Sequence, residues 1–431
     1  MSSSSSISPA VDHLADLALW EAELATDAQM VASSLVGRLG QVPDPRDPRG
    51  RQHPLVVVLV LTACATLAVG NDSLTAIWQW AAGTGQDVLA RLGGRFDGWT
   101  GRYLVPSEAT FRRVLTRVDG DSLDDALSGY VGDVLAGTAV APMLPAGPGP
   151  VEREQRRAVR RQVTHPAPAG LLPAAAADGK LLHGSVTAGS RTFLVAAIDH
   201  ATGMVLGQRQ VADKRGESTA VQPLLSGLPA GVVWTLDALH TSKKTARLIT
   251  GPLRGHYILF LKANQPLALQ AAQALLSGTD TEFAGGVHTD LDRGHGRTER
   301  RSIRVADCDD TLFPGARQVF RLRRDTGGLD GQRTSKQIVY GIASMSADLA
   351  PAAHLHHYNR RHWTVENRLH YVRDVSFRED ISQVRTGNAP RAAATFRNLS
   401  VNTIRYAGRA NIAYARRDLR SHADVFAVYG I

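Results

Sequence analysis

Three acidic residues, far apart in the sequence, have surroundings that suit metal-dependent chemistry on nucleic acid. Asp178 follows the apolar stretch LLPAAAA, Asp237 follows GVVWTL, and Glu366 lies among aromatic and basic residues in YNRRHWTVENRLHYVRDVSFRED. Carboxylate oxygens are the ligands that Mg²⁺ prefers. Two Mg²⁺ ions roughly 3.5–4 Å apart can stabilise the attacking and leaving oxygens of a phosphodiester displacement. Taken singly, each acid is equally typical of a turn, a helix N-cap or a solvated helix face.

The segment around Glu366 predicts a helix that carries both acidic and cationic groups. At 3.6 residues per turn, His362, Glu366 and Arg373 share one face of this helix. A carboxylate there can hold a divalent cation while the cationic neighbours hold a phosphate. Two later acids of the segment, Glu379 and Asp380, are expected to be structural.

The two aspartates are predicted to lie on strands of one sheet. Asp178 ends an apolar strand, and residues 193–211 read as two further strands joined by a turn that contains Gly203. Asp237 ends a short buried strand, and ligands of open α/β sheets gather at such strand ends. The segment HYILFLKANQ supplies the next strand, and the polar, strand-like residues after it predict a β-rich insertion.

These motifs, in this order, resemble insertion-sequence transposases of the DDE, ribonuclease-H-like superfamily, in the branch that contains the H-repeat-associated proteins. The Glu366 segment is similar to the pattern R-x-H-W-x-[IV]-E-N-x-L-H-[WY]-x-x-D-V-x-F-x-E-D, and D-A-x-H-T at Asp237 has the form found in this branch. The resemblance implies an α/β, ribonuclease-H-like catalytic core with a β-rich insertion and a helical N-terminal domain. It also implies that Asp178 bridges two Mg²⁺ ions, for which Mn²⁺ substitutes, while Asp237 and Glu366 hold one ion each.

The same resemblance nominates residues that contact DNA. Lys262, in l-K-x-N-Q, is expected to face the cleft, and His362 and Trp363 are expected to touch the DNA backbone or an unstacked base. The wider superfamily surrounds its glutamate with Y-x-x-R-x-x-x-E-x-x-x-x-x-x-K. This chain departs from that pattern, because its tyrosine is one residue too far away, a histidine stands at the Arg position and an arginine stands at the Lys position. The remaining candidates are Tyr358, Arg361, Arg373 and, on the insertion, Arg297, for which an exposed strand is an equal reading.

The chain is expected to divide into four parts. Residues 1–140 are predicted to be a helical domain, and PDPRDPRGRQHP and PSEATFRRV resemble the N-terminal domain associated with the same transposases. We expect this domain to bind DNA ends, although a packing or dimerisation domain with exposed arginines is an open alternative. Its predicted features include a buried helix from Leu55 and a helix capped by Ser107, with Asn71 or Asp72 capping another. The other parts are a Pro/Gly/Arg-rich linker, 141–173, a core, 174–265 and 346–431, and the insertion, 266–345.

Composition is consistent with a polyanionic partner. The chain has 431 residues and a formal net charge of +9, and a basic balance favours nucleic acid. Its two cysteines exclude a disulfide framework and a Cys-based zinc site. The clustered histidines His354, His356, His357, His362 and His370 suggest zinc, but their spacing lacks the pattern of a known helical zinc motif. The longest apolar run is too short for a membrane-spanning helix.

The sequence therefore predicts a cytoplasmic, nucleoid-associated DNA transposase that cleaves strands at element ends and transfers them into target DNA. Its expected partners are double-stranded DNA at terminal inverted repeats, target DNA and a second copy of the chain on paired ends, with no membrane. Two alternatives stay open. One is a DNA-binding relative that is catalytically silent or domesticated, and the other is a two-metal nuclease that does not transpose.

Overall fold

The computed structural model describes residues 30–68, 73–145, 166–185, 191–211, 217–228, 230–283, 286–294, 296–329 and 332–431. The expected caps Asn71 and Asp72 and the arginine-rich part of the linker lie outside these ranges. Packing divides the chain into two compact units, one of Met1–Ala146, Gly387–Leu399 and Arg416–Ile431, and one of Gly147–Thr386 and Ser400–Ala415. These units are defined by packing alone, so the four-part functional division stays a prediction.

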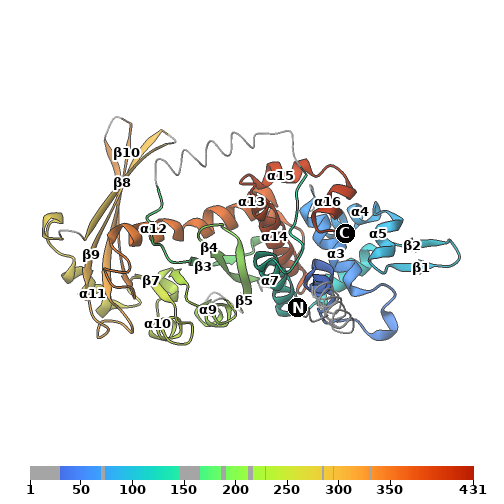
Figure 1. Cartoon of the computed structure of the whole chain (residues 1–431), viewed down its shortest axis with the longest axis horizontal. Coiled ribbons are helices and arrows are strands. Elements are labelled where there is room, and N and C mark those ends of the chain that lie inside the picture. The colour runs from blue at the N-terminus through green and yellow to red at the C-terminus, as the bar shows by residue number, and fades with distance from the viewer. Residues whose placement is uncertain are drawn as a thin grey trace, which may run out of the picture. The chain divides into compact units, whose positions relative to one another are not determined.

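The second unit is built on a mixed sheet, for which the described residues supply nine strands in the order β5-β4-β3-β6-β7-β11-β10-β9-β8 (Figure 1). An antiparallel meander comes first, and β6 and β7 then run parallel to β3. Its strands are β3 (Ala174–Leu181), β4 (Phe193–Asp199), β5 (Val205–Val211), β6 (Val233–Leu236) and β7 (His256–Leu261). This is the order of a ribonuclease-H-like core, and the predicted α/β fold is confirmed.

Four antiparallel strands extend the same sheet beyond β7. They are β8 (Val287–Gly294), β9 (Arg297–Asp307), β10 (Gln318–Gly328) and β11 (Arg333–Ala343). β11 pairs with β7, so the β-rich insertion continues the core sheet and ends at the edge strand β8. Backbone hydrogen bonds therefore join the insertion directly to β7, the strand that precedes Lys262.

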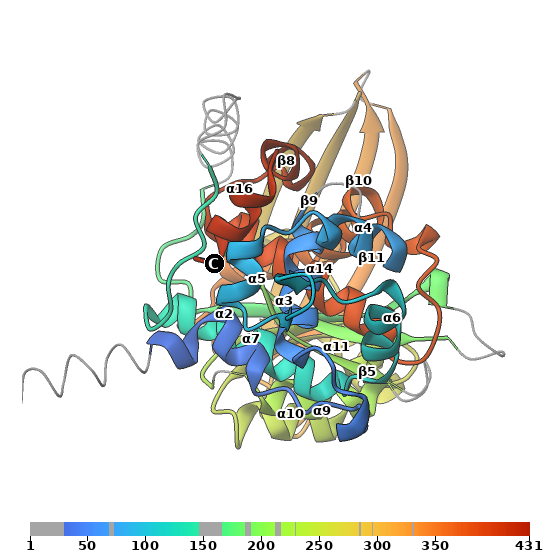
Figure 2. The same ribbon diagram turned by 90° about the vertical axis from the view of Figure 1, so that its right-hand side faces the viewer.

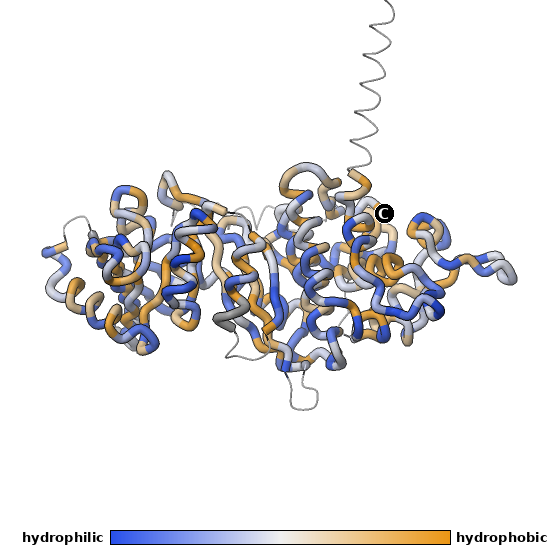
Figure 3. The backbone as a smooth tube through the Cα atoms, turned by 90° about the horizontal axis from the view of Figure 1, so that it is seen from below, coloured by the Kyte–Doolittle hydropathy of each residue, from blue (hydrophilic) through white to orange (hydrophobic). Residues whose placement is uncertain are grey.

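Helices cover both faces of this sheet because its central strands are apolar on both sides, as expected for parallel strands. One face packs Trp234, Tyr257 and Phe313 with residues of α9 (Glu217–Ser226), α10 (Lys243–Thr250) and α11 (Pro266–Leu275). The other packs Ile258 and Phe320 against α12 (Ala352–His362). A π-helical turn (Glu366–His370) and α13 (Tyr371–Ser376) follow α12. Figure 3 shows hydrophobic and hydrophilic residues interspersed along the chain.

The first unit is mainly helical (Figure 2). Its elements are α2 (Leu35–Gly40), α3 (Leu55–Leu67), α4 (Leu74–Ala82), α5 (Gln86–Arg91), β1 (Arg95–Asp97), β2 (Arg102–Leu104), α6 (Glu108–Arg117), α7 (Gly120–Ala136) and α16 (His422–Val428). α14 (Ala389–Tyr406) and α15 (Ile412–Asp418) have residues in both units. The predicted buried helix from Leu55 and the Ser107 cap, which accepts from the Thr110 amide at 3.3 Å, are confirmed.

The C-terminal segments belong to the first unit through buried polar contacts as well as apolar packing. Arg391 on α14 pairs with Asp124 on α7 at 2.6 Å, and Asp124 is almost fully buried. His422 stacks on Trp80 with ring centroids 4.4 Å apart. Within the described ranges, no helix combines the length and the hydropathy needed to cross a bilayer.

Candidate active site

The first two acids lie beside each other on neighbouring strands. β3 and β6 are parallel, and their last register pair joins Ala177 to Leu236. Asp178 and Asp237 come next on their respective strands, so their backbones are separated by about one interstrand spacing, roughly 4.8 Å. Both side chains are partly exposed, at 29% and 39%. The sheet therefore presents two carboxylates at the point where pairing between β3 and β6 ends.

Local hydrogen bonds hold both aspartates. Asp237 caps the short helical turn after β6, where its Oδ1 accepts from the Leu239 amide at 2.9 Å. Oδ1 of Asp178 accepts from the Gly179 amide at 2.8 Å. Such bonds fix the positions of the two carboxylates.

Glu366 and Asp178 are brought together around His370. Nδ1 of His370 lies 3.2 Å from Oε2 of Glu366 and 3.9 Å from Oδ2 of Asp178. Each of these three residues offers a ligand atom within 4.8 Å of the others. The His370 hydrogen bond, with weaker contributions from the charges of His370 and Lys180, lowers the pKa of Glu366 below its ordinary value. Glu366 is therefore held as a carboxylate at neutral pH.

The helix that carries Glu366 is interrupted rather than continuous. α12 ends at His362, and the Tyr371 amide bonds to the carbonyl of Glu366, which makes Glu366–His370 a π-helical turn. A π-turn inserts an extra residue and changes the helical register, and such turns are frequent at functional sites. Here Leu369 is buried, whereas the Glu366 side chain is 58% exposed. The expectation of one regular face across this segment was wrong.

A lysine joins the two segments behind the carboxylates. Nζ of Lys180, on β3, lies 2.7 Å from Asp374 and 3.4 Å from Asp380. Burial raises the pKa of Asp374 even though Lys180 opposes this shift. Lys180 therefore fastens the strand of Asp178 to the segment that follows Glu366.

Some of the side chains predicted to contact DNA are accessible to solvent in the structure. Lys262, immediately after β7, and Arg297, at the start of β9, are exposed, and Trp363 is 56% exposed. Arg361 is partly buried on the last turn of α12. These four side chains remain candidates for DNA contact.

Three other predicted contacts are buried, which contradicts a direct surface role for them. Arg373 is fully buried and pairs with Glu379. The Tyr358 hydroxyl donates to the Leu172 carbonyl at 3.2 Å and accepts from its amide at 2.8 Å. His362 is 6% exposed, with Nδ1 3.2 Å from the Thr235 hydroxyl, and burial lowers its pKa to about 4. Each of these side chains fastens α12 or α13 to the sheet.

His370 is the residue that sequence reasoning undervalued, because we considered it only as a member of the histidine cluster. Its spacing of four residues from Glu366 was the available signal, since that spacing brings two side chains together on a helix. The two are in fact in contact, although the turn between them is π-helical. Its proximity to Asp178 could not be predicted from the sequence.

Comparison with known proteins gives the family to which the chain belongs. Residues 177–403 match the family described as "Transposase DDE domain", and residues 36–131 match "DDE_Tnp_1-associated". The chain belongs to the DDE transposase family, as its motifs predicted.

Relatives with similar sequences carry corresponding names. The chain is 26% identical over 395 residues to "Putative transposase YncI" of Escherichia coli O157:H7, covering 87% of this chain and 88% of that protein. It is 27% identical over 242 residues to "H repeat-associated putative transposase YhhI" of Escherichia coli strain K12, covering 53% and 63%. A piggyBac transposase synaptic complex with hairpin DNA has a TM-score of 0.37 and 12% identity, covering 93% of this chain and 76% of that one.

Proposed function

We propose that this transposase cleaves DNA strands at the ends of its element and joins them to target DNA, using Asp178, Asp237 and Glu366. The observation that carries the proposal is the convergence of Asp178 with Glu366 around His370, beside Asp237 on the next strand. Family membership supports divalent-metal chemistry. The alternatives of a silent relative and of a nuclease that does not transpose are outcomes of the tests below.

The residues present fit two Mg²⁺ ions. The acids are partly exposed, so they can accept ligands without unfolding. Bound metal ions would activate the attacking oxygen and neutralise charge on the leaving oxygen. In our proposal Asp178, Asp237 and Glu366 would hold the ions. His370 orients Glu366, and Lys180 fixes the strand of Asp178.

The decisive experiment replaces each acid by its amide and measures nicking of duplex DNA that carries the element's ends. Glu366→Gln, Asp178→Asn and Asp237→Asn should each abolish Mg²⁺-dependent nicking and strand transfer while DNA binding persists. Combining them should add little, because groups that act as a unit are non-additive. Asp348→Asn, at an exposed acid before α12, is the matched control, and Mn²⁺ should support the wild-type reaction.

Near-normal nicking by Glu366→Gln would mean that another acid completes the site. Nicking without strand transfer by the wild-type chain would favour the nuclease. Binding of end DNA by the wild-type chain, with neither reaction in Mg²⁺ or Mn²⁺, would favour the silent relative.

We further propose that the first unit recognises DNA at terminal inverted repeats. Its β1–β2 hairpin carries Trp99 at its tip, 99% exposed, flanked by the exposed Arg95 and Arg102. An aromatic side chain on a basic hairpin can contact a groove or a base. Trp99→Ala should weaken binding to end DNA more than binding to unrelated duplex, and equal weakening would place end recognition elsewhere.

Truncation of the N-terminal region is a poorer test of the same role. It would remove Asp124 and leave the buried Arg391 without its carboxylate.

We expect the active form to be a homodimer on paired ends, because transposition joins two ends of one element. Light scattering of a reactive complex with end DNA should give two chains. A competent complex that contains one chain would exclude this assembly.

A further inference from the structure

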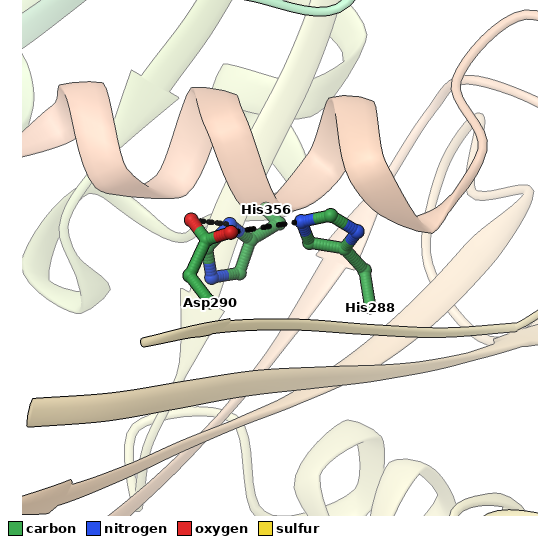
Figure 4. Close-up of side chains that lie close together, drawn as sticks. All are labelled: His288, Asp290 and His356. Carbon is green, nitrogen blue, oxygen red and sulfur yellow. Dashed lines mark hydrogen bonds and ion pairs between the residues drawn. The ribbon is translucent and has the colours of Figure 1, made fainter. Parts of the chain in front are cut away.

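A second group of metal-ligating side chains lies away from the three acids. His288 and Asp290 are two residues apart on β8, so they lie on the same face of the edge strand, and His356 reaches them from α12. Nε2 of His288 lies 3.2 Å from Oδ1 of Asp290, and Nδ1 of His356 lies 3.4 Å from Oδ2. Figure 4 shows one dashed contact from each oxygen of the Asp290 carboxylate, one to His356 and one to His288.

The spacing suits a tetrahedral metal ion. Zn²⁺ binds histidine nitrogen and carboxylate oxygen at about 2.0–2.2 Å, which places neighbouring ligands roughly 3.3–3.5 Å apart on the edges of a tetrahedron. His288 Nε2 lies 3.2 Å from one oxygen of Asp290 and His356 Nδ1 lies 3.4 Å from the other, so each imidazole is about one such edge length from the carboxylate. Ligand atoms of all three residues lie within 4.8 Å of one another, so small rotations of the rings complete the geometry.

The chemistry of the donors favours zinc over magnesium. Imidazole suits Zn²⁺ and neighbouring transition metals, whereas Mg²⁺ prefers oxygen ligands. Arg360 pairs with Asp292 and lies 3.5 Å from Asp290, so Asp292 supplies a carboxylate for the guanidinium when Asp290 binds metal.

We propose that His288, Asp290 and His356 form a zinc site that fastens the edge strand of the insertion to α12. Three protein ligands leave a fourth position for water. The site holds α12 in place ahead of the π-helical turn that carries Glu366, and its ligand set differs from that of the three acids. The spacing of the histidine cluster in the sequence argued against zinc, and two of its members, His362 and His370, contact Thr235 and Glu366. Of that cluster, only His356 belongs to the proposed site.

In the test, the full-length chain is first stripped of metal with a chelator and then dialysed against Zn²⁺ with excess Mg²⁺. The Mg²⁺ is added to occupy the carboxylate site. The zinc that remains bound to the chain is then measured. Wild type should retain about one equivalent of zinc per chain at this site. His288→Ala should lose it, with affinity falling by more than the roughly 10–100-fold cost of losing an outer-shell partner. Because the His288 side chain is 36% exposed, this change should leave the fold intact.

Two controls separate this site from its neighbours. His354→Ala removes a histidine from the same helix but outside the cluster, and Glu366→Gln alters the carboxylate site, so both should retain the zinc.

Asp290→Asn keeps the size of the side chain and should behave like His288→Ala. Zn²⁺ should also raise the melting temperature of wild type and not of His288→Ala.

The proposal fails if wild type binds no zinc, or if His288→Ala and Asp290→Asn both bind zinc as tightly as wild type. The cluster would then be a hydrogen-bonded pair of imidazoles on one carboxylate. Loss of the zinc in Glu366→Gln would also overturn the proposal, because it would assign the metal to the three acids.

Discussion

Arg373 and Glu379 form a bidentate ion pair that is almost fully removed from solvent. Nε of Arg373 lies 2.8 Å from Oε2 of Glu379 and Nη2 lies 2.9 Å from Oε1, with the side chains 0% and 1% exposed. Arg373 also donates to the Gln208 side chain on β5 at 3.2 Å. The pair therefore ties the segment after Glu366 to the edge of the core meander.

Breaking this pair should destabilise the second unit. Glu379→Gln leaves the Arg373 charge buried without its carboxylate, which costs about 3–5 kcal/mol of unfolding free energy. Urea denaturation should show this loss, whereas the exposed control Asp348→Asn should change stability by less than about 0.5 kcal/mol. Equal stabilities of the two variants would mean that Arg373 finds another partner. Glu379→Gln is consequently unsuitable as a neutral control for Glu366→Gln.

Stability of the second unit should fall in mildly acidic solution. His200 and His362 both contact the Thr235 hydroxyl, and burial lowers their pKa values to about 3 and about 4. An unfolded chain binds protons at these histidines near pH 6.5, so between about pH 6.5 and 4 the unfolded state binds more protons than the folded state. Stability is then fully present above about pH 6.5 and declines as the pH falls.

Melting temperatures measured across this range should decline with acid, and His362→Gln should make the decline shallower. His183→Gln removes an exposed histidine of the same unit and should leave the slope unchanged. A wild-type melting temperature that is constant from pH 7 to 5 would contradict the buried, neutral state of these rings.

The neighbouring positions of the aspartates were predictable because each follows a run of apolar residues, and parallel strands align such runs. The prediction that Asp178 ends its strand was wrong, since β3 continues to Leu181. The role of Arg373 was not predictable. A seven-residue spacing from Glu366 assumes a regular helix, but a π-turn intervenes and a carboxylate six residues later captures the guanidinium. The cluster of His288, Asp290 and His356 was equally unpredictable, because β8 and α12 are far apart in the sequence and come together only in the folded chain.

Lys262 should contribute to DNA binding through its charge. It is exposed directly after β7, next to the strand of Asp237. If it neutralises one phosphate, Lys262→Ala should reduce the log–log slope of affinity against salt by about 0.9. The control is Lys244→Ala. Lys244 is exposed on α10, which covers the face of the sheet opposite α12, so this variant should leave the slope unchanged. The measurement is fluorescence anisotropy of labelled end DNA over a salt series, and identical slopes for both variants would remove Lys262 from the interface.

His370 should act by positioning Glu366. It donates to Glu366 at 3.2 Å and lowers the pKa of that carboxyl, while its own Nε2 has no hydrogen-bond partner among the described residues. His370→Ala should slow nicking about 10–100-fold, the cost of losing an outer-shell partner, and raise the Mg²⁺ concentration needed for half-maximal rate. Because the pKa of Glu366 then rises toward its ordinary value, the acidic limb of the pH–rate profile should move to higher pH.

His370→Gln is the informative companion, because its amide can donate a hydrogen bond to Glu366 without offering an imidazole ligand. It should recover part of the rate and return the acidic limb toward the wild-type position. A positioning role predicts this rescue, since only the donated hydrogen bond is required. If His370→Gln is instead as impaired as His370→Ala, and both lose Mn²⁺ binding in titrations without DNA, His370 is itself a metal ligand.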